Sequence, residues 1–326
     1  MKVECKKKKF TYFFAETHPI LRETKDNTNR VEKKQVHLIF YSKVQFILKK
    51  QQENPQRFLL SIERNRKKKH YMQKVRPKKA LGQHFLTDLS VAERIADTLS
   101  GYIGTPVLEV GPGMGVLTEY LLEKGHDLQV VELDGESVEY LQRNFPSLEG
   151  RIIAKDFLTL DLDKIYEGDF CVIGNYPYNI SSQIFFKVLD HKDKVKCCSG
   201  MLQKEVAERI AAKPGSKTYG ILSVLLQAWY DAEYLFTVSE HVFNPPPKVK
   251  SGVIRLTRNN VSKLDCDEIK FKQVVKTTFG QRRKTLRNSV KSLCSNPEIL
   301  SDPIFNKRPE QLSVEEFVYL TNLISK

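Results

Sequence analysis

Short apolar runs alternate with longer amphipathic stretches from Met72 onward, and this alternation limits the fold more than any other feature of the sequence. The runs are rich in β-branched and aliphatic residues, as strands buried inside a sheet are. The stretches between them are long enough to be crossover helices. This order predicts an α/β fold with a parallel sheet covered on both faces. The expected strands are 106–110, 128–133, 151–155, 170–174 and 195–202, with strand-like segments at 228–238 and 252–257.

The basic charge of the chain gathers at its N-terminal end. The formal net charge is +14, and residues 1–71 hold 19 lysines and arginines against 7 aspartates and glutamates. Residues 72–326 hold 34 against 32, and all 16 glycines follow Met72. These two compositions indicate that the nearly neutral part from Met72 onward carries the fold.

Three interpretations apply to residues 1–71. A secretory signal does not fit, because the basic run Lys6–Lys9 is not followed by a continuous apolar core and a small-residue cleavage site. A disordered basic arm that contacts RNA phosphates is one alternative. We favour a non-native start, with the working start at Met72, the first methionine after Met1.

Two domains are expected after this extension. The run Arg258-Asn259-Asn260 interrupts the last strand-like segment, so we expect an α/β domain over 72–260 and a small all-α domain over 261–326. The six cysteines show no C-x-x-C spacing and no paired histidines, which argues against a disulfide framework and a zinc site. No apolar run reaches the roughly eighteen residues that a membrane-spanning helix needs. We therefore expect a cytoplasmic protein without a metal.

A glycine loop follows the first expected strand. It reads Glu109-Val110-Gly111-Pro112-Gly113-Met114-Gly115, and a helical stretch comes directly after it. Glycines let the backbone approach a ligand, and a helix N-terminus adds partial positive charge. The third glycine comes one residue earlier than a dinucleotide fingerprint requires, which disfavours a nicotinamide cofactor. The loop favours S-adenosylmethionine, bound at Gly111 and Gly113; a structural tight turn is the alternative.

The next two expected strands also end in groups that suit a nucleoside. Glu132 ends the second strand, where a carboxylate can accept both hydroxyl hydrogens of a ribose. Asp156 and Phe157 follow the third strand and offer an acceptor for an adenine amine and an apolar surface for its ring. Either acid alone would pass for a solvated strand end. Because ligands of open α/β sheets bind along this edge, the three strand ends together predict an S-adenosylmethionine site.

The strongest chemical signal is Asn175-Tyr176-Pro177-Tyr178, which follows the fourth expected strand. The exocyclic nitrogen of adenine is a poor nucleophile, because its lone pair is delocalised into the ring. The Asn175 side-chain oxygen and a backbone carbonyl at Tyr176 or Pro177 can accept both amine hydrogens and favour a pyramidal nitrogen. Pro177 keeps that carbonyl oriented, and Tyr178 offers a flat face for the base. We expect adenine methylation at this motif; a plain Asn-Tyr-Pro turn is the alternative.

Phe243 precedes three consecutive prolines. A stiff polyproline-like segment can hold its aromatic ring against a base that has been flipped out of an RNA helix. We therefore count Phe243 among the expected catalytic residues. A plain proline-rich connector is the alternative.

A basic stripe is expected in the C-terminal domain. Arg283, Arg287 and Lys291 recur every four residues, as the residues on one face of a helix do. The apolar residues of the same stretch fall on another face of the expected amphipathic helix. We expect the stripe to contact RNA phosphates; a solvated helix face is the alternative.

From about Lys78 to its C-terminus, the chain resembles the ribosomal RNA small-subunit adenine dimethyltransferases of the KsgA/RsmA type, which are related to eukaryotic nucleolar dimethylases and erythromycin-resistance methylases. The resemblance rests on the segments 81–86 (LGQHFL), 109–115 (EVGPGMG), 175–180 (NYPYNI), 201–206 (MLQKEV), 243–249 (FNPPPKV) and 279–288 (FGQRRKTLRN). It implies a Rossmann-like methyltransferase domain followed by a small helical domain. It also implies that two adjacent adenines near the 3′ end of small-subunit rRNA become N6,N6-dimethyladenine.

The resemblance also implies a set of cofactor contacts. They fall on His84, Leu86, Gly111, Glu132, Asp156 and Asn175. The chain departs from the family pattern at two positions, because family members commonly have Asn where His84 stands and Leu where Tyr176 stands. His84 still suits its role if the contact uses backbone atoms, and we expect Tyr176 to narrow the pocket for the target base.

Three classes of function fit the sequence. The leading one is a small-subunit rRNA adenine dimethyltransferase that acts on a partly assembled ribosomal particle as a monomer. The nearest alternative is an N6-adenine methylase of large-subunit rRNA or of DNA. The third is a ribosome-assembly factor without catalysis, and the intact motif at 175–178 argues against it.

Overall fold

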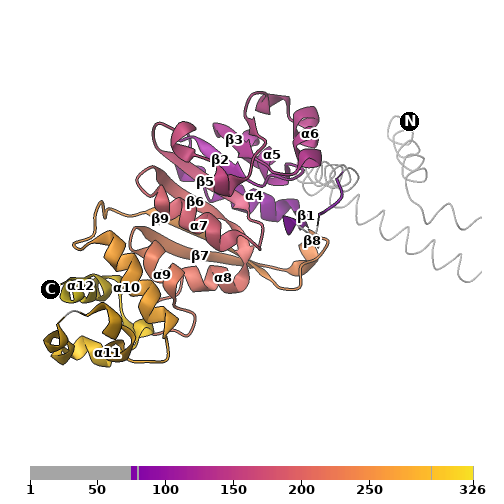
Figure 1. Ribbon diagram of the computed structural model, residues 1–326. Coiled ribbons are helices and arrows are strands. Elements are labelled where there is room, and N and C mark those ends of the chain that lie inside the picture. The colour runs from indigo at the N-terminus through magenta and orange to yellow at the C-terminus, as the bar shows by residue number, and fades with distance from the viewer. Residues whose placement is uncertain (1–74, 79–80, 295, 326) are drawn as a thin grey trace, which may run out of the picture. The chain divides into compact units, whose positions relative to one another are not determined.

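The structure is a computed structural model that describes residues 75–78, 81–294 and 296–325 (Figure 1). All of these residues belong to one of the two units into which the chain divides, Lys67–Lys326. The expectations for residues 1–71, whether a non-native start or a basic arm, lie outside the described residues.

A seven-stranded sheet in the order β4-β3-β2-β5-β6-β9-β7 forms the centre of the described part (Figure 1). Neighbouring strands from β4 to β6 run parallel. Each expected strand is present, and β4 is much shorter than expected. The strands are β2 (Val107–Val110), β3 (Leu128–Val131), β4 (Ile152–Ile153), β5 (Phe170–Asn175), β6 (Val195–Gln203), β7 (Tyr230–Val238) and β9 (Ser251–Arg258).

The far side of the sheet corrects the expectation that all its strands are parallel. Strand β9 lies between β6 and β7 and runs antiparallel to both. Residues 239–250, which join β7 to β9, contain a short 3-10 turn and a two-residue strand but no crossover helix. A connection without such a helix returns the chain in the opposite direction, so the sheet is mixed.

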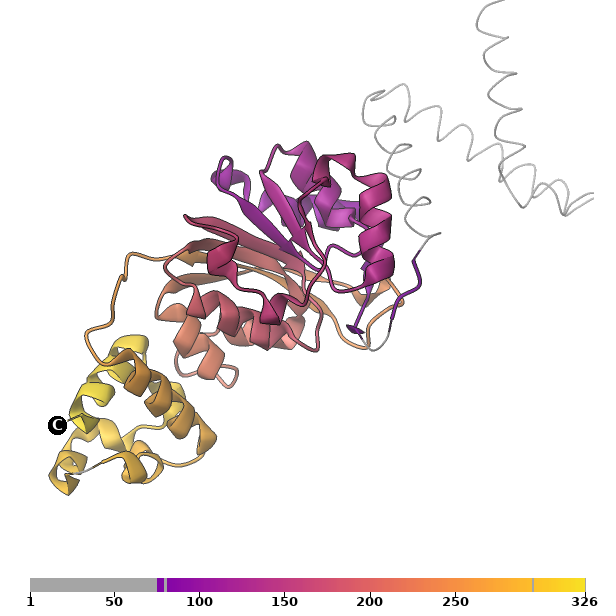
Figure 2. The ribbon, with the colours of Figure 1, turned by 45° about the horizontal axis from the view of Figure 1, so that its top comes forward.

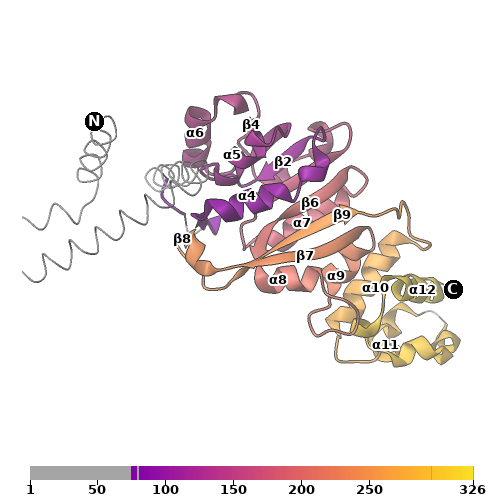
Figure 3. The same ribbon diagram turned by 180° about the vertical axis from the view of Figure 1, so that it is seen from behind.

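Helices cover both faces of the sheet (Figures 1 and 3). One face carries α4 (Leu89–Asp97), α5 (Val116–Glu123) and α6 (Gly135–Asn144), and the other carries α7 (Ser181–Asp190), α8 (Lys204–Ile210) and α9 (Ile221–Gln227). Successive residues of one strand point to opposite faces. Cys171 and Ile173 accordingly pack in the cluster of α4 and α5, whereas Val172 packs in the cluster of α7 and α9.

The C-terminal helices form an orange-to-yellow group that one connection after β9 joins to the sheet (Figure 2). They are α10 (Glu268–Gly280), α11 (Leu286–Ser289) and α12 (Val314–Ile324), with several short 3-10 turns. Their apolar residues belong to the same hydrophobic cluster as α7, α8 and α9. The boundary at 260/261 falls within the connection, and the independence of the two domains stays a prediction.

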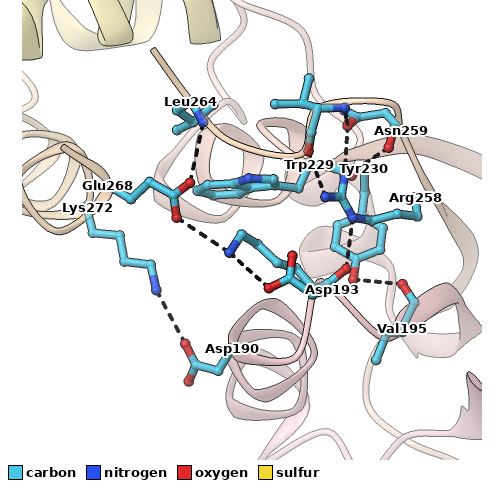
Figure 4. Close-up of polar contacts among 12 residues, drawn as sticks. Asp190, Asp193, Val195, Trp229, Tyr230, Arg258, Asn259, Leu264, Glu268 and Lys272 are labelled. Carbon is cyan, nitrogen blue, oxygen red and sulfur yellow. Dashed lines mark hydrogen bonds and ion pairs between the residues drawn. The ribbon is translucent and has the colours of Figure 1, made fainter. Parts of the chain in front are cut away.

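Arg258 holds the start of this connection (Figure 4). Its guanidinium donates to the backbone carbonyls of Lys192, Trp229 and Val261, at 2.8, 2.9 and 2.6 Å. The Lys192 ammonium pairs in turn with the Glu268 carboxylate at 3.4 Å, at the beginning of α10. These contacts tie the first helix of the C-terminal group to the end of the sheet.

A second, two-stranded sheet joins segments that are far apart in the chain. Strand β1 (Phe85–Leu86) pairs antiparallel with β8 (Phe243–Asn244). The sequence did not predict this pairing. The expected polyproline-like segment therefore begins as a short strand.

The buried imidazole of His126 indicates that the fold loses stability in acid. Its side chain is 5% exposed, and neither ring nitrogen has a hydrogen-bond partner among the described residues. Burial, and to a lesser extent Lys124, lowers the pKa of this imidazole. Below about pH 6.5, the His126 imidazole is therefore protonated in the unfolded chain but stays neutral in the folded chain. The free energy of unfolding should then fall by up to ~1.4 kcal/mol per pH unit.

Denaturant titrations of the parent and of His126→Phe between pH 7 and 5 test this prediction. The variant should lose less stability than the parent. His241→Gln, at a histidine whose side chain is 84% exposed, should keep the full loss of the parent. Equal losses in the parent and in His126→Phe would contradict the prediction.

Candidate active site

A cavity lies at the carboxyl ends of β2, β3 and β5, where the sequence predicted a ligand site. Residues 81–86, which precede α4, also line the cavity, and we call them the cover segment. The cavity contains all the predicted cofactor residues and the motif at 175–178. The predicted residues that line it are His84, Leu86, Gly111, Gly113, Glu132, Asp156, Asn175, Tyr176, Pro177 and Tyr178.

The glycine loop needs its glycines for two reasons. Gly111, Gly113 and Gly115 all have positive φ values, at 68°, 56° and 77°, which side chains rarely adopt. A Cβ atom on Gly113 would also lie 3.0 Å from the Phe85 ring, and one on Gly115 would lie 2.4 Å from the Phe145 ring. Helix α5 begins directly after Gly115. The loop thus presents backbone rather than side chains to the cavity, which suits close approach of a nucleoside ligand.

Glu132 is held rigidly at the end of β3. Its side chain is 6% exposed, Oε2 accepts the Gly113 N–H at 3.0 Å, and Oε1 accepts the Asp134 N–H at 2.9 Å. Burial raises the pKa of this carboxyl, and the two backbone hydrogen bonds oppose that effect. Each oxygen keeps lone pairs for further donors. The geometry therefore fits the predicted contact with the two ribose hydroxyls.

Glu109, on β2, is a second buried acid whose role the sequence did not predict. It is 1% exposed and accepts a hydrogen bond from the Thr118 hydroxyl at 2.6 Å. Burial raises the pKa of its carboxyl to about 8. Glu109 therefore carries its proton at neutral pH and adds no charge to the floor of the cavity.

Asp156 lies beyond β4, at another part of the cavity lining. Its Oδ1 accepts the Leu158 N–H at 2.9 Å and so begins the 3-10 turn Phe157–Thr159. This local bond fixes the carboxylate at the turn. Phe157 is 4% exposed and also lines the cavity. The pair has the acceptor and the apolar surface that an adenine ring requires.

Asn175 is the last residue of β5. Its Nδ2 amide donates to the His84 backbone carbonyl at 3.2 Å. Since the amide nitrogen is used in this way, Oδ1 is the atom that Asn175 has available as an acceptor. No sequence signal linked Asn175 to His84, because the two residues are far apart in the chain.

The structure corrects the expectation that Tyr176 narrows the pocket for the target base. Its side chain is 1% exposed, and its ring packs edge-on against Phe185 at a centroid distance of 5.6 Å. The Tyr176 hydroxyl donates to the Ser199 carbonyl at 2.7 Å. The ring fits in the core because glycines lie against it on the neighbouring strands β5 and β6. A Cβ on Gly174 of β5 would lie 3.0 Å from the ring, and a Cβ on Gly200 of β6 would lie 2.7 Å from it. The predicted role of the Tyr176 backbone carbonyl is unaffected.

Tyr178 is held from two sides. Its hydroxyl hydrogen-bonds with the Ser251 hydroxyl, and its ring stacks on the His84 imidazole, with the centroids 5.5 Å apart. Burial raises the pKa of the Tyr178 hydroxyl. Tyr178 is therefore a neutral, oriented ring at the cavity, as a stacking surface for a base needs to be.

The cover segment is anchored by Lys78, three residues before it, and by its last residue, Leu86. The Lys78 ammonium pairs with the carboxylates of Asp134 and Glu136, at the start of α6. At the other end, Leu86 belongs to β1, and its side chain is 5% exposed. The segment is thereby held across the cavity.

Phe243 is the predicted catalytic residue that does not line the cavity. It belongs to β8, is 4% exposed and packs in the hydrophobic cluster of α4 and α5. A ring in this position presents no face to a base. Stacking of a base on Phe243 would first require the ring to turn out of the cluster.

The predicted basic stripe does not lie on one helix. Helix α10 ends at Gly280, residues 281–285 form a turn, and α11 spans only Leu286–Ser289. Arg283 therefore precedes α11, Arg287 lies within it, and Lys291 begins a 3-10 turn. All three side chains are exposed. The prediction of one continuous amphipathic helix is wrong, because an i, i+4 pattern of charges does not reveal where a helix is interrupted.

Within 75–78, 81–294 and 296–325, no cluster of three or more His, Cys, Asp or Glu side chains is arranged to hold a metal ion. None of the helices in that part of the chain is both long enough and apolar enough to cross a bilayer. The five cysteines that the structure describes are free.

Comparison with known families identifies the chain. The family model described as ribosomal RNA adenine dimethylase matches residues 74–326. The chain belongs to this family. Similar relatives include two proteins named ribosomal RNA small subunit methyltransferase A. The one from Parabacteroides distasonis is 71% identical over 257 residues, which are 78% of this chain and 96% of the relative. The one from Porphyromonas gingivalis is 61% identical over 258 residues, covering 78% of this chain and all of the relative.

Solved structures show the same fold as this dimethylase-family chain. A dimethyladenosine transferase from Plasmodium falciparum matches with a TM-score of 0.63 and 24% identity, covering 73% of this chain and 96% of that one. The 23S rRNA methyltransferase ErmE matches with a TM-score of 0.56 and 24% identity, covering 74% of this chain and all of that one. The predicted Rossmann-like methyltransferase fold is confirmed.

Proposed function

We propose that the chain is an S-adenosylmethionine-dependent adenine dimethyltransferase of small-subunit rRNA. The observation that supports this proposal is that two features line one cavity. They are the predicted nucleoside-binding residues that follow β2 and β3, and the Asn175–Tyr178 motif at the end of β5. Membership of the rRNA adenine dimethylase family and the names of the relatives support the substrate. The alternative on large-subunit rRNA or DNA has no comparable support, because the 23S rRNA methyltransferase ErmE is only 24% identical and shares the fold alone.

S-adenosylmethionine supplies an electrophilic methyl group bonded to a positively charged sulfur. The chain's own residues fit this cofactor. Glu132 would accept hydrogen bonds from the ribose hydroxyls, Asp156 would accept one from the adenine amine, and Phe157 would lie against the adenine ring. The loop at Gly111 and Gly113 admits the ligand, because side chains there would clash or strain the backbone.

The target adenine meets the motif at the end of β5. Asn175 Oδ1 and the backbone carbonyl at Tyr176 or Pro177 accept the two hydrogens of N6. These hydrogen bonds favour a pyramidal nitrogen, whose lone pair is then available for reaction instead of being delocalised into the ring. Bound S-adenosylmethionine would supply the methyl group that N6 takes up, and N6 would release one of its protons to solvent. A second round gives the dimethylated amine. No strong base is needed, so the neutral groups at this site suffice.

The proposed partner is small-subunit rRNA in a partly assembled particle, and the proposed state is a cytoplasmic monomer without a metal. Labelled S-adenosylmethionine, incubated with small-subunit particles that lack the methyl groups, tests the function. Nucleoside analysis should find the label in N6,N6-dimethyladenosine from two adjacent positions near the rRNA 3′ end. Monomethyladenine in DNA or in large-subunit rRNA would replace this proposal by the methylase alternative, and absence of label would favour an assembly factor.

Binding to the small-subunit particle should depend on salt through three basic side chains, Arg283, Arg287 and Lys291. The three side chains are exposed, although they do not share one helix. Replacing all three with Gln should leave the cofactor affinity unchanged and weaken binding to the particle. Each lost phosphate contact should reduce the log–log salt slope by roughly 0.7–0.9, so the triple variant should lose about two units.

A titration of particle binding against salt measures this slope for the parent and the triple variant. The matched control replaces three basic side chains on the other domain, Arg143, Lys164 and Lys196, with Gln. That control should keep the slope of the parent. Parallel slopes for the parent and the first triple variant would show that Arg283, Arg287 and Lys291 are only solvated.

A further inference from the structure

The side chain and the backbone of His84 have different partners. The backbone carbonyl accepts a hydrogen bond from the Asn175 amide at 3.2 Å. The imidazole instead stacks on Tyr178, with an interplanar angle of 30°, and its Nδ1 lies 2.8 Å from the Pro245 carbonyl oxygen. Since a carbonyl oxygen only accepts, Nδ1 carries the hydrogen of that bond.

These contacts place the imidazole between the motif and the segment after β8. Tyr178 comes from the motif, and Pro245 follows Phe243–Asn244. The Ser251 hydroxyl, at the start of β9, holds the hydroxyl end of the Tyr178 ring. The imidazole is thus the contact on the ring face of Tyr178, and Ser251 is the contact at its hydroxyl.

We propose that the His84 imidazole is a positioning residue for the target base, acting through Tyr178 and the Pro245 carbonyl. The inference rests on the proposed function, because it concerns the base that this site methylates. It separates two roles within one residue. The backbone of His84 serves Asn175, and the imidazole holds the surface on which the base stacks.

The link between the cover segment and β8 does not depend on the imidazole. The Thr87 backbone N–H and hydroxyl both donate to the Val242 carbonyl, at 2.7 and 2.9 Å. The backbones of β1 and β8 pair beside them. Removal of the imidazole therefore leaves the cover segment attached and removes only the contacts with the Tyr178 ring face and the Pro245 carbonyl.

Three variants divide the contacts of His84. His84→Phe keeps a ring against Tyr178 but has no donor, His84→Asn keeps a donor but has no ring, and His84→Ala has neither. We expect the rate of a single methyl transfer on small-subunit particles to fall about tenfold in His84→Ala and about threefold in each of the other two. The dissociation constant of S-adenosylmethionine, measured by calorimetry, should stay within about twofold of the parent in all three.

Thr87→Val is the matched control, because it removes a side-chain bond between the same segments without touching Tyr178. It should transfer methyl groups at the rate of the parent. Parent-like rates in all three His84 variants would overturn the inference, as would a loss of cofactor affinity that matches the loss of rate. An equal loss in Thr87→Val would assign the effect to the attachment of the cover segment and would also overturn it. Failure of the proposed function is distinguishable, since the parent itself would then form no dimethyladenosine.

Discussion

Replacement of Asn175 by alanine is expected to lower the rate of methyl transfer by about a hundredfold or more. The amide nitrogen of Asn175 is already bonded to the His84 carbonyl, so Oδ1 is the acceptor that it offers to the target amine. An acceptor of this kind matters most as the nitrogen becomes pyramidal. The loss should therefore appear mainly in the chemical step, with a smaller loss of cofactor affinity.

Single-turnover methylation of small-subunit particles, at saturating S-adenosylmethionine, measures the Asn175 effect separately from binding. Asn175→Asp is the informative companion, because it keeps an acceptor at the same place but loses the donor to the His84 carbonyl. It should be faster than Asn175→Ala and slower than the parent. A near-normal single-turnover rate in Asn175→Ala would remove Asn175 from the chemistry.

The parts of the site on β2, β3 and β5 were predictable because parallel strands share an edge. Once the apolar runs are assigned to strands, the residues that follow them must lie together, and Gly111, Glu132 and Asn175 do. The apolar spacing in the C-terminal region was also informative. Leu286 and Val290 are fully buried although the helix that should carry them is only one turn long.

Contacts between distant segments were not predictable in the same way. The pairing of Phe85 with Asn244 and the stacking of His84 on Tyr178 depend on the folded path of the chain, which leaves no local pattern. Strand direction has the same limit, since period-two burial is identical in parallel and antiparallel strands and did not reveal the reversal of β9. Phe243 was assigned from its proline-rich neighbours, and tertiary packing in a cluster outweighed that local signal.

Replacement of Glu132 by alanine is expected to weaken S-adenosylmethionine binding by about ten- to a hundredfold. The direct loss is charge-assisted hydrogen bonding to the ribose hydroxyls, and a net loss of about 1.5–3 kcal/mol corresponds to this range. A second loss comes from the protein itself, because the N–H groups of Gly113 and Asp134 lose their carboxylate partner. The glycine loop is then no longer held in its binding geometry.

Calorimetric titration with S-adenosylmethionine tests the Glu132 prediction, and three variants separate its causes. Asp156→Ala removes an acceptor that holds only the local Leu158 N–H, so its loss should be smaller than that of Glu132→Ala. Glu132→Gln keeps one oxygen for one backbone donor but turns an NH₂ group toward the other, and it should therefore bind S-adenosylmethionine little better than Glu132→Ala does.

The affinity of the parent for S-adenosylmethionine should also depend on pH. Because burial raises the pKa of Glu132, its carboxylate should be protonated at a higher pH than usual, which weakens binding as the pH falls; Glu132→Gln should lack this dependence. Unchanged dissociation constants in both Glu132→Ala and Asp156→Ala would mean that the cofactor binds elsewhere.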